Sequence, residues 1–330
     1  MLNIGIAGCG SIARQRHASE YARNEAARIA GFFDLNAGRA QALADSSIGA
    51  VSVCVANKSH ADYAIAALNA GKHVLCEKPM AISLSECEAM TQAAQKNGRR
   101  LLIGQNQRLA PAHAYAKRIL ASGEMGRVLS FQSVFGHKGP ESWSVDQSAD
   151  TWFFKKEFAA FGSMADLGIH KIDLLLYLVG KEPESVYASL MTLDKTFPDG
   201  RPIEVDDNSV VMLRFAGGPA GTVTTSWTHY GEECNSTVLY CEKGIVKMYA
   251  DPRYALQIVY ADGVRANYEL PAMQTNDDAQ QTGSGVIDTF LEGITSGCPT
   301  ILDAPDILRS MRVVFACLDS ASSGRPVSIL

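Results

Sequence analysis

The stretch LNIGIAGCGSIA at residues 2–13 decides the fold of this chain. Its first half predicts a short buried strand, and a helix-compatible segment follows to about residue 24. Gly8, Gly10 and Ala13 stand between them in the pattern G-x-G-x-x-A, which allows a tight turn, close approach of the backbone to a pyrophosphate and close packing of helix on strand. Free N–H groups at a helix start bind phosphate. The stretch therefore predicts a dinucleotide site, and Ser11 and Ile12 are expected to contact the dinucleotide as well.

An acidic residue follows the second predicted strand. This strand, at residues 29–33, ends in Asp34, 24 residues after Gly10. A carboxylate at about this distance binds the adenosine ribose diol and repels a 2′-phosphate, so Asp34 favours NAD over NADP. Arg39 argues in the opposite direction, because a nearby arginine can accommodate that phosphate. The favoured interpretation of Arg39 is an exposed residue on the next helix.

Strands and helices alternate through the first third of the chain. This alternation predicts a doubly wound, mostly parallel α/β domain over residues 1–118. The strand-like runs lie at residues 51–55, 73–76 and 100–104, and the helix-like runs at residues 61–70 and 83–97.

One spacing does not fit this pattern. Between Asp34 and residue 51 the fold needs a further strand and usually a helix, and the sequence leaves no room for them. We therefore expect a segment to be missing near residues 44–45, with a true deletion of one βα unit as the alternative.

The second half predicts a different architecture. Its strand-like runs are joined by short turns, which indicates an α+β domain over residues 119–330 with a large, mostly antiparallel, open sheet. A second subunit would cover the open face, so we expect a homodimer or homotetramer through this sheet. The runs lie at residues 128–134, 185–192, 209–215, 221–227, 236–240 and 244–249, and helical periodicity occurs at 162–179, 286–296 and 306–322.

Composition narrows the class of protein. The chain has 330 residues, enough for two cores, with 47% hydrophobic and 20% charged residues. Its net charge of −5 argues against nucleic acid or an anionic membrane as the main partner. No apolar run approaches the ~20 residues of a membrane helix, and the start does not resemble a signal peptide. Its 8 cysteines are scattered without a Cys-x-x-Cys pair, which predicts reduced thiols in a cytoplasmic protein.

The tripeptide Glu77-Lys78-Pro79 directly follows the apolar strand at residues 73–76. An ammonium group is costly to bury without a partner, and a lysine that holds a developing oxyanion is a common catalytic device. The alternative is a strand that has simply reached solvent. Taken alone, the tripeptide does not decide between the two.

Asp166 and His170 lie four residues apart on the predicted helix at residues 162–179 and so share one face. Most of the helix is apolar. One alternative is an intrahelical hydrogen bond that satisfies a core histidine. Another is a shared metal ion, but no further His or Cys cluster completes such a site, so no metal is predicted.

Five motifs occur in order along the chain: GCGSIA at 8–13, Asn57-x-x-His60, GKHVLCEKP at 71–79, GQNQR at 104–108 and DLGIH at 166–170. Together with the closing helices and last strand, these motifs resemble the Gfo/Idh/MocA oxidoreductases, which include glucose–fructose oxidoreductase and inositol dehydrogenases. The resemblance implies NAD(P)-dependent hydride transfer at a secondary hydroxyl or carbonyl carbon of a sugar, inositol or related polyol.

The same resemblance implies roles for individual residues. His170 would take the hydroxyl proton, Lys78 would hold the reacting oxygen, and Asp166 would orient the substrate and tune the histidine. Beside the cofactor it implies Asn57, His60, Glu77, Lys78 and Asn106, with Glu77 at the nicotinamide ribose. Beside the substrate it implies Lys78, Asn106, Arg108, Asp166, His170 and Trp152, the last with an ordinary core tryptophan as the alternative.

Two other functions stay open at this point. The chain could be a non-catalytic sensor that binds NAD(H), or an enzyme whose tightly bound NAD is recycled within one turnover. Specificity for one sugar would depend on the loops at residues 135–152 and 230–235.

Overall fold

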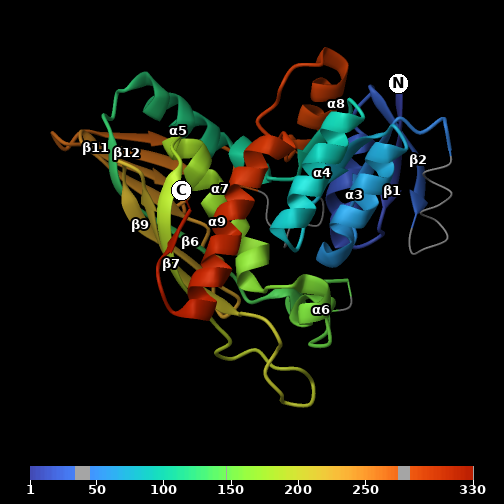
Figure 1. Cartoon of the computed structure of the whole chain (residues 1–330). Coiled ribbons are helices and arrows are strands. Elements are labelled where there is room, and N and C mark those ends of the chain that lie inside the picture. Colours follow the sequence, from blue (N-terminus) through green and yellow to red (C-terminus); the bar gives the residue numbers. More distant parts are fainter. Residues whose placement is uncertain (34–44, 146, 274–282, 330) are drawn as a thin grey trace.

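The computed structural model describes residues 1–33, 45–145, 147–273 and 283–329. Two β-sheets with their helices lie side by side (Figure 1). In this described part, no helix is both long and apolar enough to cross a membrane.

The first sheet is parallel throughout and has the strand order β2-β1-β3-β4-β5. The chain moves from β1 to one side and returns on the other, so the loops after β1 and β3 meet where the order reverses, which is where such folds bind ligands. The predicted α/β domain is confirmed. Its elements are β1 (Leu2–Ala7), η1 (Ala13–Ala18), α1 (Ser19–Tyr21), β2 (Ala27–Phe33), β3 (Ala50–Val53), η2 (Asn57–Ser59), α3 (His60–Asn69), β4 (His73–Cys76), α4 (Leu84–Lys96) and β5 (Leu101–Ile103).

Within the described residues, β2 is the edge strand of this sheet. A strand beyond β2 would be expected if the chain contained the additional βα unit, so its absence there agrees with both interpretations of the short spacing. The junction at 44–45 borders residues outside the described part, and the choice between a missing segment and a deletion stays a prediction.

The second sheet has the order β13-β12-β11-β10-β6-β9-β8-β7-β14, and its β6–β9 pair is parallel while the other pairs are antiparallel. All six predicted runs form strands, and β12 and β13 extend the sheet beyond the prediction. The strands are β6 (Val128–Gly136), β7 (Pro183–Met191), β8 (Asn208–Phe215), β9 (Ala220–Ser226), β10 (Thr237–Cys241), β11 (Gly244–Met248), β12 (Leu256–Tyr260), β13 (Arg265–Tyr268) and β14 (Val327–Ser328).

The helices of the second half join the two sheets. α9 packs on β7 and also contacts α4 and β5 of the first domain, and Figure 1 shows it between the two halves. The helical elements are η3 (Asn106–Leu109), α5 (Pro111–Ser122), η4 (Pro140–Ser142), η5 (Trp152–Phe154), α6 (Lys156–Ala159), η6 (Met164–Gly168), α7 (Ile169–Val179), α8 (Val286–Ser296) and α9 (Ala304–Ser323).

The sequence boundary at residue 118 lies inside α5. In addition, α8 returns to the first domain, where Phe290 and Leu291 share a hydrophobic core with Ile4 and Ile6 of β1. Packing therefore assigns part of the C-terminal region to the first domain, and the division 1–118 and 119–330 stays a prediction.

Candidate active site

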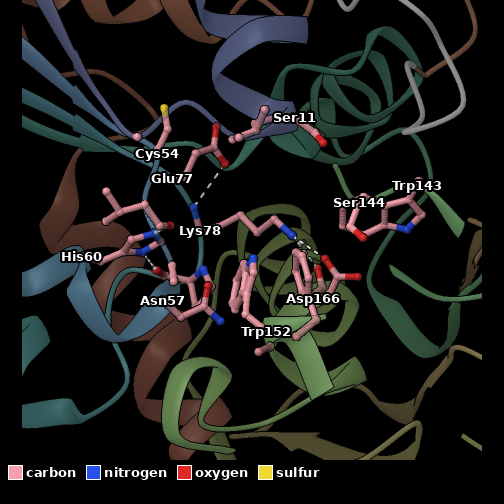
Figure 2. A pocket seen from close by; sticks show the side chains of 18 of the residues that line it. Ser11, Cys54, Asn57, His60, Glu77, Lys78, Trp143, Ser144, Trp152 and Asp166 are labelled. Carbon is pink, nitrogen blue, oxygen red and sulfur yellow. Dashed lines mark hydrogen bonds and ion pairs between the residues drawn. The ribbon is translucent and has the colours of Figure 1, made fainter. Parts of the chain in front are cut away.

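A cavity of about 680 Å³ lies where the two domains meet. In Figure 2 the Lys78 side chain extends toward Asp166, and Trp143 and Ser144 lie beyond that carboxylate. The first domain contributes the loop after β1, the turn after β3 and the tripeptide after β4, and the second contributes η6, α7 and two loops. The lining includes Gly8, Gly10, Ser11, Ile12, Asn57, His60, Glu77, Lys78, Asn106, Phe135, Trp143, Trp152, Asp166, His170 and Glu233.

The glycine loop fits the predicted pyrophosphate site. Gly8 has φ +93°, and a Cβ at this position would collide with the carbonyl oxygen of Cys54, so only glycine lets β1 turn so close to β3. A Cβ on Gly10 would meet nothing within 4 Å, which leaves its backbone open to a ligand in the cavity. Ser11 and Ile12 line the same wall.

Glu77 points back into the first domain. Its Oε1 accepts hydrogen bonds from Arg16 Nη1 at 3.2 Å and His17 Nε2 at 2.8 Å. Burial alone would raise the pKa of Glu77, but the charge of Arg16 and the hydrogen bond from His17 outweigh it and hold the pKa well below its usual range. Glu77 is therefore an ionised, fixed carboxylate on the cavity wall.

Asn57 and His60, predicted to lie beside the cofactor, line the cavity, and both side chains are hydrogen-bonded to the protein backbone. Asn57 Nδ2 donates to Ala159 O at 3.2 Å. The ring nitrogens of His60 lie 2.7 Å from Pro79 O and 3.0 Å from Val55 O, and burial lowers the pKa of this imidazole. His60 thus connects the turn after β3 to the tripeptide after β4.

Lys78 crosses from the first domain to the second. Its Nζ donates to Asp166 Oδ1 at 2.8 Å and to the Asp166 carbonyl oxygen at 2.9 Å. The Lys78 side chain is 19% exposed and that of Asp166 is 4% exposed, so Lys78 has not simply reached bulk solvent. The interpretation of Glu77-Lys78-Pro79 as part of a site fits this geometry.

Asp166 is surrounded by positive and polar groups. Trp227 Nε1 donates to its Oδ2 at 3.1 Å, and His137 Nε2 lies 3.7 Å from the same oxygen. Burial alone would raise the pKa of Asp166. The charges of Lys78 and His137 outweigh this effect, so the pKa of Asp166 lies below its usual value. Asp166 is therefore a carboxylate whose two oxygens are both held.

His170 faces the same cavity from α7. Its ring lies 6.1 Å from that of Phe135, and its Nδ1 has no hydrogen-bond partner within the described part of the chain. Burial, followed by the charge of Lys78, holds the pKa of His170 well below its ordinary value. The Asp166 carboxylate accepts hydrogen bonds from Lys78 and Trp227. These contacts do not include the intrahelical Asp166–His170 hydrogen bond that was the alternative. No three potential metal ligands gather among the described residues.

The structure places two of the remaining predicted site residues at the cavity and does not describe a third. Asn106 lines the cavity, and so does Trp152, which stacks on Phe153 with ring centroids 3.9 Å apart. Asp34 lies outside the described residues.

That Arg108 borders the substrate stays a prediction. Arg108 is not among the residues that line the cavity. Its Nε and Nη2 each donate to the carboxylate of Asp173 at 2.7 Å, and its Nη1 donates to Ile301 O at 2.7 Å. Since the side chain is only 5% exposed, Arg108 joins η3, α7 and the segment before α9.

Comparison with known proteins assigns the family. Residues 2–105 match the model of an oxidoreductase family with an NAD-binding Rossmann fold, and residues 113–247 match a GFO/IDH/MocA C-terminal domain. Levoglucosan dehydrogenase of Pseudarthrobacter phenanthrenivorans is 30% identical over 93% of this chain and 82% of its own length. The chain belongs to the Gfo/Idh/MocA family. The predicted family, the oxidoreductase class and the NAD-binding Rossmann fold are confirmed.

Two further relatives cover the whole chain. Glucose-6-phosphate 3-dehydrogenase of Bacillus subtilis is 32% identical over 100% of this chain and 99% of its own. That alignment extends over 360 positions, more than the 330 residues present here. The solved structure of a levoglucosan dehydrogenase in complex with NADH and levoglucosan superimposes with a TM-score of 0.83 at 25% identity, covering 100% of this chain and 99% of that one.

Several lining residues of this Gfo/Idh/MocA protein were not identified individually from the sequence. The two loops singled out for specificity do contribute to the cavity. Arg16 and His17, which hold Glu77, lie 61 and 60 residues away from it, and only the basic run after Ala13 could have hinted at them. The unpredicted lining residues include Gln107, Phe135, Trp143, Ser144, Glu233 and Asn235.

Proposed function

We propose that this protein is an NAD-dependent dehydrogenase that moves a hydride between the nicotinamide and a secondary carbinol of a sugar, inositol or related polyol. The observation that carries the proposal is the meeting of the Lys78–Asp166 pair and the buried imidazole of His170 in one cavity. The similarity to levoglucosan dehydrogenase and glucose-6-phosphate 3-dehydrogenase supports a sugar as the substrate class.

The residues present fit a dinucleotide. Gly8, Gly10, Ser11 and Ile12 would hold the pyrophosphate on free backbone N–H groups, and Glu77 and Asn57 would border the nicotinamide half. Bound NAD supplies the hydride acceptor. The preference for NAD over NADP rests on Asp34, whose carboxylate would repel a 2′-phosphate.

Lys78 is the residue that holds the reacting oxygen. An ammonium group has three N–H donors, and two of those on Lys78 go to Asp166. The third is left for the carbinol or carbonyl oxygen, where it stabilises the negative charge that develops during the reaction. Asp166 fixes the direction of this donor because Trp227 in turn holds the carboxylate.

His170 accepts the hydroxyl proton. Its low pKa keeps the imidazole neutral at physiological pH, so a ring nitrogen is available as an acceptor. In the direction of reduction the same nitrogen returns the proton to the oxygen.

The outer face of the second sheet supports the proposal of a homodimer or homotetramer. Tyr187 on β7 pairs in register with Met212 on β8, and these side chains are 42% and 55% exposed. Exposed apolar side chains together on one sheet face mark interaction surfaces. The free cysteines support a cytoplasmic location. Met212→Lys should lower the mass measured by light scattering, and an unchanged mass would refute this interface.

NADH formation across a panel of sugars and inositols, levoglucosan included, tests the activity. Wild-type protein should turn over at least one neutral member, and Lys78→Ala should lower kcat/KM by at least 100-fold. Binding of NAD without any turnover would refute the proposal in favour of a sensor. NAD that co-purifies and resists dialysis would indicate internal recycling instead.

A further inference from the structure

Asp166 and His170 stand on one continuous helical segment. They belong to η6 and α7, and Gly168 and Ile169, where these two elements meet, both have helical backbone angles. A shift of the first turn therefore moves the carboxylate and the imidazole together. The start of a helix leaves free N–H groups, which need partners when they are buried. The direction of this segment thus depends on what its first turn is bonded to.

The first turn is bonded to one carboxylate from another part of the chain. The side chain of Asp206, in the loop between β7 and β8, accepts from Gly162 N at 2.7 Å and from Met164 N at 2.8 Å. The same carboxylate accepts from Ser163 Oγ, and the Asp206 carbonyl oxygen accepts from Ser163 N, both at 2.8 Å. Both Asp206 and Ser163 are buried, so water has little access to these bonds.

The contact between Asp206 and the helix start is close enough to require a glycine. A Cβ at Gly162 would collide with the carbonyl oxygen of Asp206, so a larger residue would push the helix away from the loop. Gly162 lines the cavity, whereas Asp206 is not among the lining residues. Asp206 therefore acts on the site only through the helix that it holds.

A chain of hydroxyl groups fixes the same helix start to the second sheet. Ser163 Oγ lies 2.9 Å from Thr225 Oγ1 on β9, which lies 2.6 Å from Ser209 Oγ on β8. All three side chains are fully buried. The helix start is thus held by Asp206 on a support that is itself anchored in two central strands.

We propose that Asp206 is a positioning residue that sets the direction of the helical segment carrying Asp166 and His170. A misplacement of reacting groups by about 1 Å can lower a rate ~100-fold, so the loss of this support should affect the chemical step more than the binding of cofactor. This inference rests on the proposed function and adds a residue that acts on the reaction from outside the cavity.

Asp206→Asn tests the inference in steady-state kinetics at pH 8. Burial raises the pKa of Asp206 to about 6, so the wild-type carboxylate is ionised at this pH. Asparagine keeps the shape, but its NH2 group cannot accept from a backbone N–H, which leaves one donor of the first turn without its partner. The value of kcat should fall at least tenfold. KM for NAD should stay within threefold, because the glycine loop belongs to the other domain.

Asp207→Asn is the matched control. The Asp207 side chain is also buried, and it accepts from three backbone N–H groups, those of Leu193, Asp194 and Lys195, each at 2.8 Å. None of these three residues lines the cavity. Both variants should lower the melting temperature, but only Asp206→Asn should lower kcat by more than threefold. Equal falls in kcat, or a wild-type kcat in Asp206→Asn, overturn the inference and leave the dehydrogenase function standing.

NMR tests the positioning without any turnover. The Cε1–H signals of the 7 histidines are recorded, and the His170 signal is assigned by its absence in His170→Gln. It should shift in Asp206→Asn and stay unchanged in Asp207→Asn. An unshifted His170 signal overturns the inference. If no compound is turned over by NAD-loaded protein, the proposed function fails while this measurement still decides the positioning.

Ser163→Ala decides the question if Asp206→Asn does not fold. This change removes one of the donors to Asp206 and leaves the backbone donors of the first turn in place. It should shift the His170 signal and lower kcat with KM for NAD unchanged. A wild-type signal together with a wild-type kcat would overturn the assignment of Asp206.

Discussion

Replacing Arg108 by methionine should destabilise the protein and leave its chemistry intact. The change removes three hydrogen bonds of 2.7 Å, two to Asp173 and one to Ile301 O. Asp173 would then remain buried with Ser310 Oγ, also at 2.7 Å, as its remaining side-chain donor among the described residues. Removing one partner of a buried ion pair costs about 3–5 kcal/mol, mostly because the other charge is left uncompensated.

The assay combines unfolding in urea with steady-state kinetics at 25 °C. Arg108→Met should lower the free energy of unfolding by about 3–5 kcal/mol, and Asp173→Asn by a comparable amount. The double variant should lose less than the sum of the two, with a coupling of ~0.5–3 kcal/mol, since the two side chains are in direct contact. In the absence of urea, the kcat/KM of Arg108→Met, calculated per folded molecule, should stay within about threefold of the wild-type value.

One result would refute this reasoning. If Arg108→Met unfolds at the wild-type urea concentration while KM for the substrate rises tenfold or more, then Arg108 contacts the substrate. The position that the sequence motif implied would be right, and the ion pair with Asp173 would not describe the working enzyme.

Three further changes have defined outcomes. Burial lowers the pKa of Lys171 to about 7, below the ~10.4 of an exposed lysine. Between these values the unfolded chain binds more protons, so stability should rise with pH by up to ~1.4 kcal/mol per unit. Lys171→Met should remove that slope in urea titrations at pH 7, 8 and 9, and an unaltered slope would contradict the assignment. Gly8→Ala should lower both NADH affinity and thermal stability, because its Cβ collides with Cys54 O at a φ of +93°; NADH fluorescence titration and a melting curve at wild-type values would disprove this. Trp227→Phe removes the donor to Asp166 at 3.1 Å and should lower kcat/KM by about 10-fold or more, consistent with ~1.5–3 kcal/mol for a hydrogen bond to a charged group, whereas unchanged kinetics would show that Lys78 alone holds the carboxylate.

Most of the fold follows from local signals in the sequence. Except for the two-residue β14, the strands of both sheets alternate or run apolar over three to nine residues, and periodicity of this kind is readable without tertiary information. β12 and β13 were not predicted. None of the four residues of β13 (Arg265–Tyr268) is buried, so it lacks an apolar run. β12 (Leu256–Tyr260) is as long as β10 and β11, and nothing in its length explains why it was missed. The packing of α8 against the first domain could not be predicted from the sequence either, because an apolar helix face can pack against any hydrophobic surface.

Residues that line the cavity could be predicted where both the residue type and its position on a strand or helix pointed to a site. Lys78 follows a buried strand, and Asp166 and His170 share a helix face, so their lining of one cavity agrees with what the motifs imply. The contacts of Arg108 could not be predicted, because a buried structural arginine and a substrate-binding arginine look alike in sequence. Its partner Asp173 is 65 residues away, and nothing local connects the two.

Glu77 and Lys78 link the two walls of the cavity, one from each domain. They are consecutive, yet Glu77 is held by Arg16 and His17 behind the glycine loop, while Lys78 reaches Asp166 in the second domain (Figure 2). Each of these charges is buried or nearly so, and each is compensated by a partner of opposite sign on a different element. A displacement of the tripeptide after β4 would therefore break both pairs at once. Glu77 thus anchors the tripeptide within the first domain, and Lys78 joins the tripeptide to the second domain.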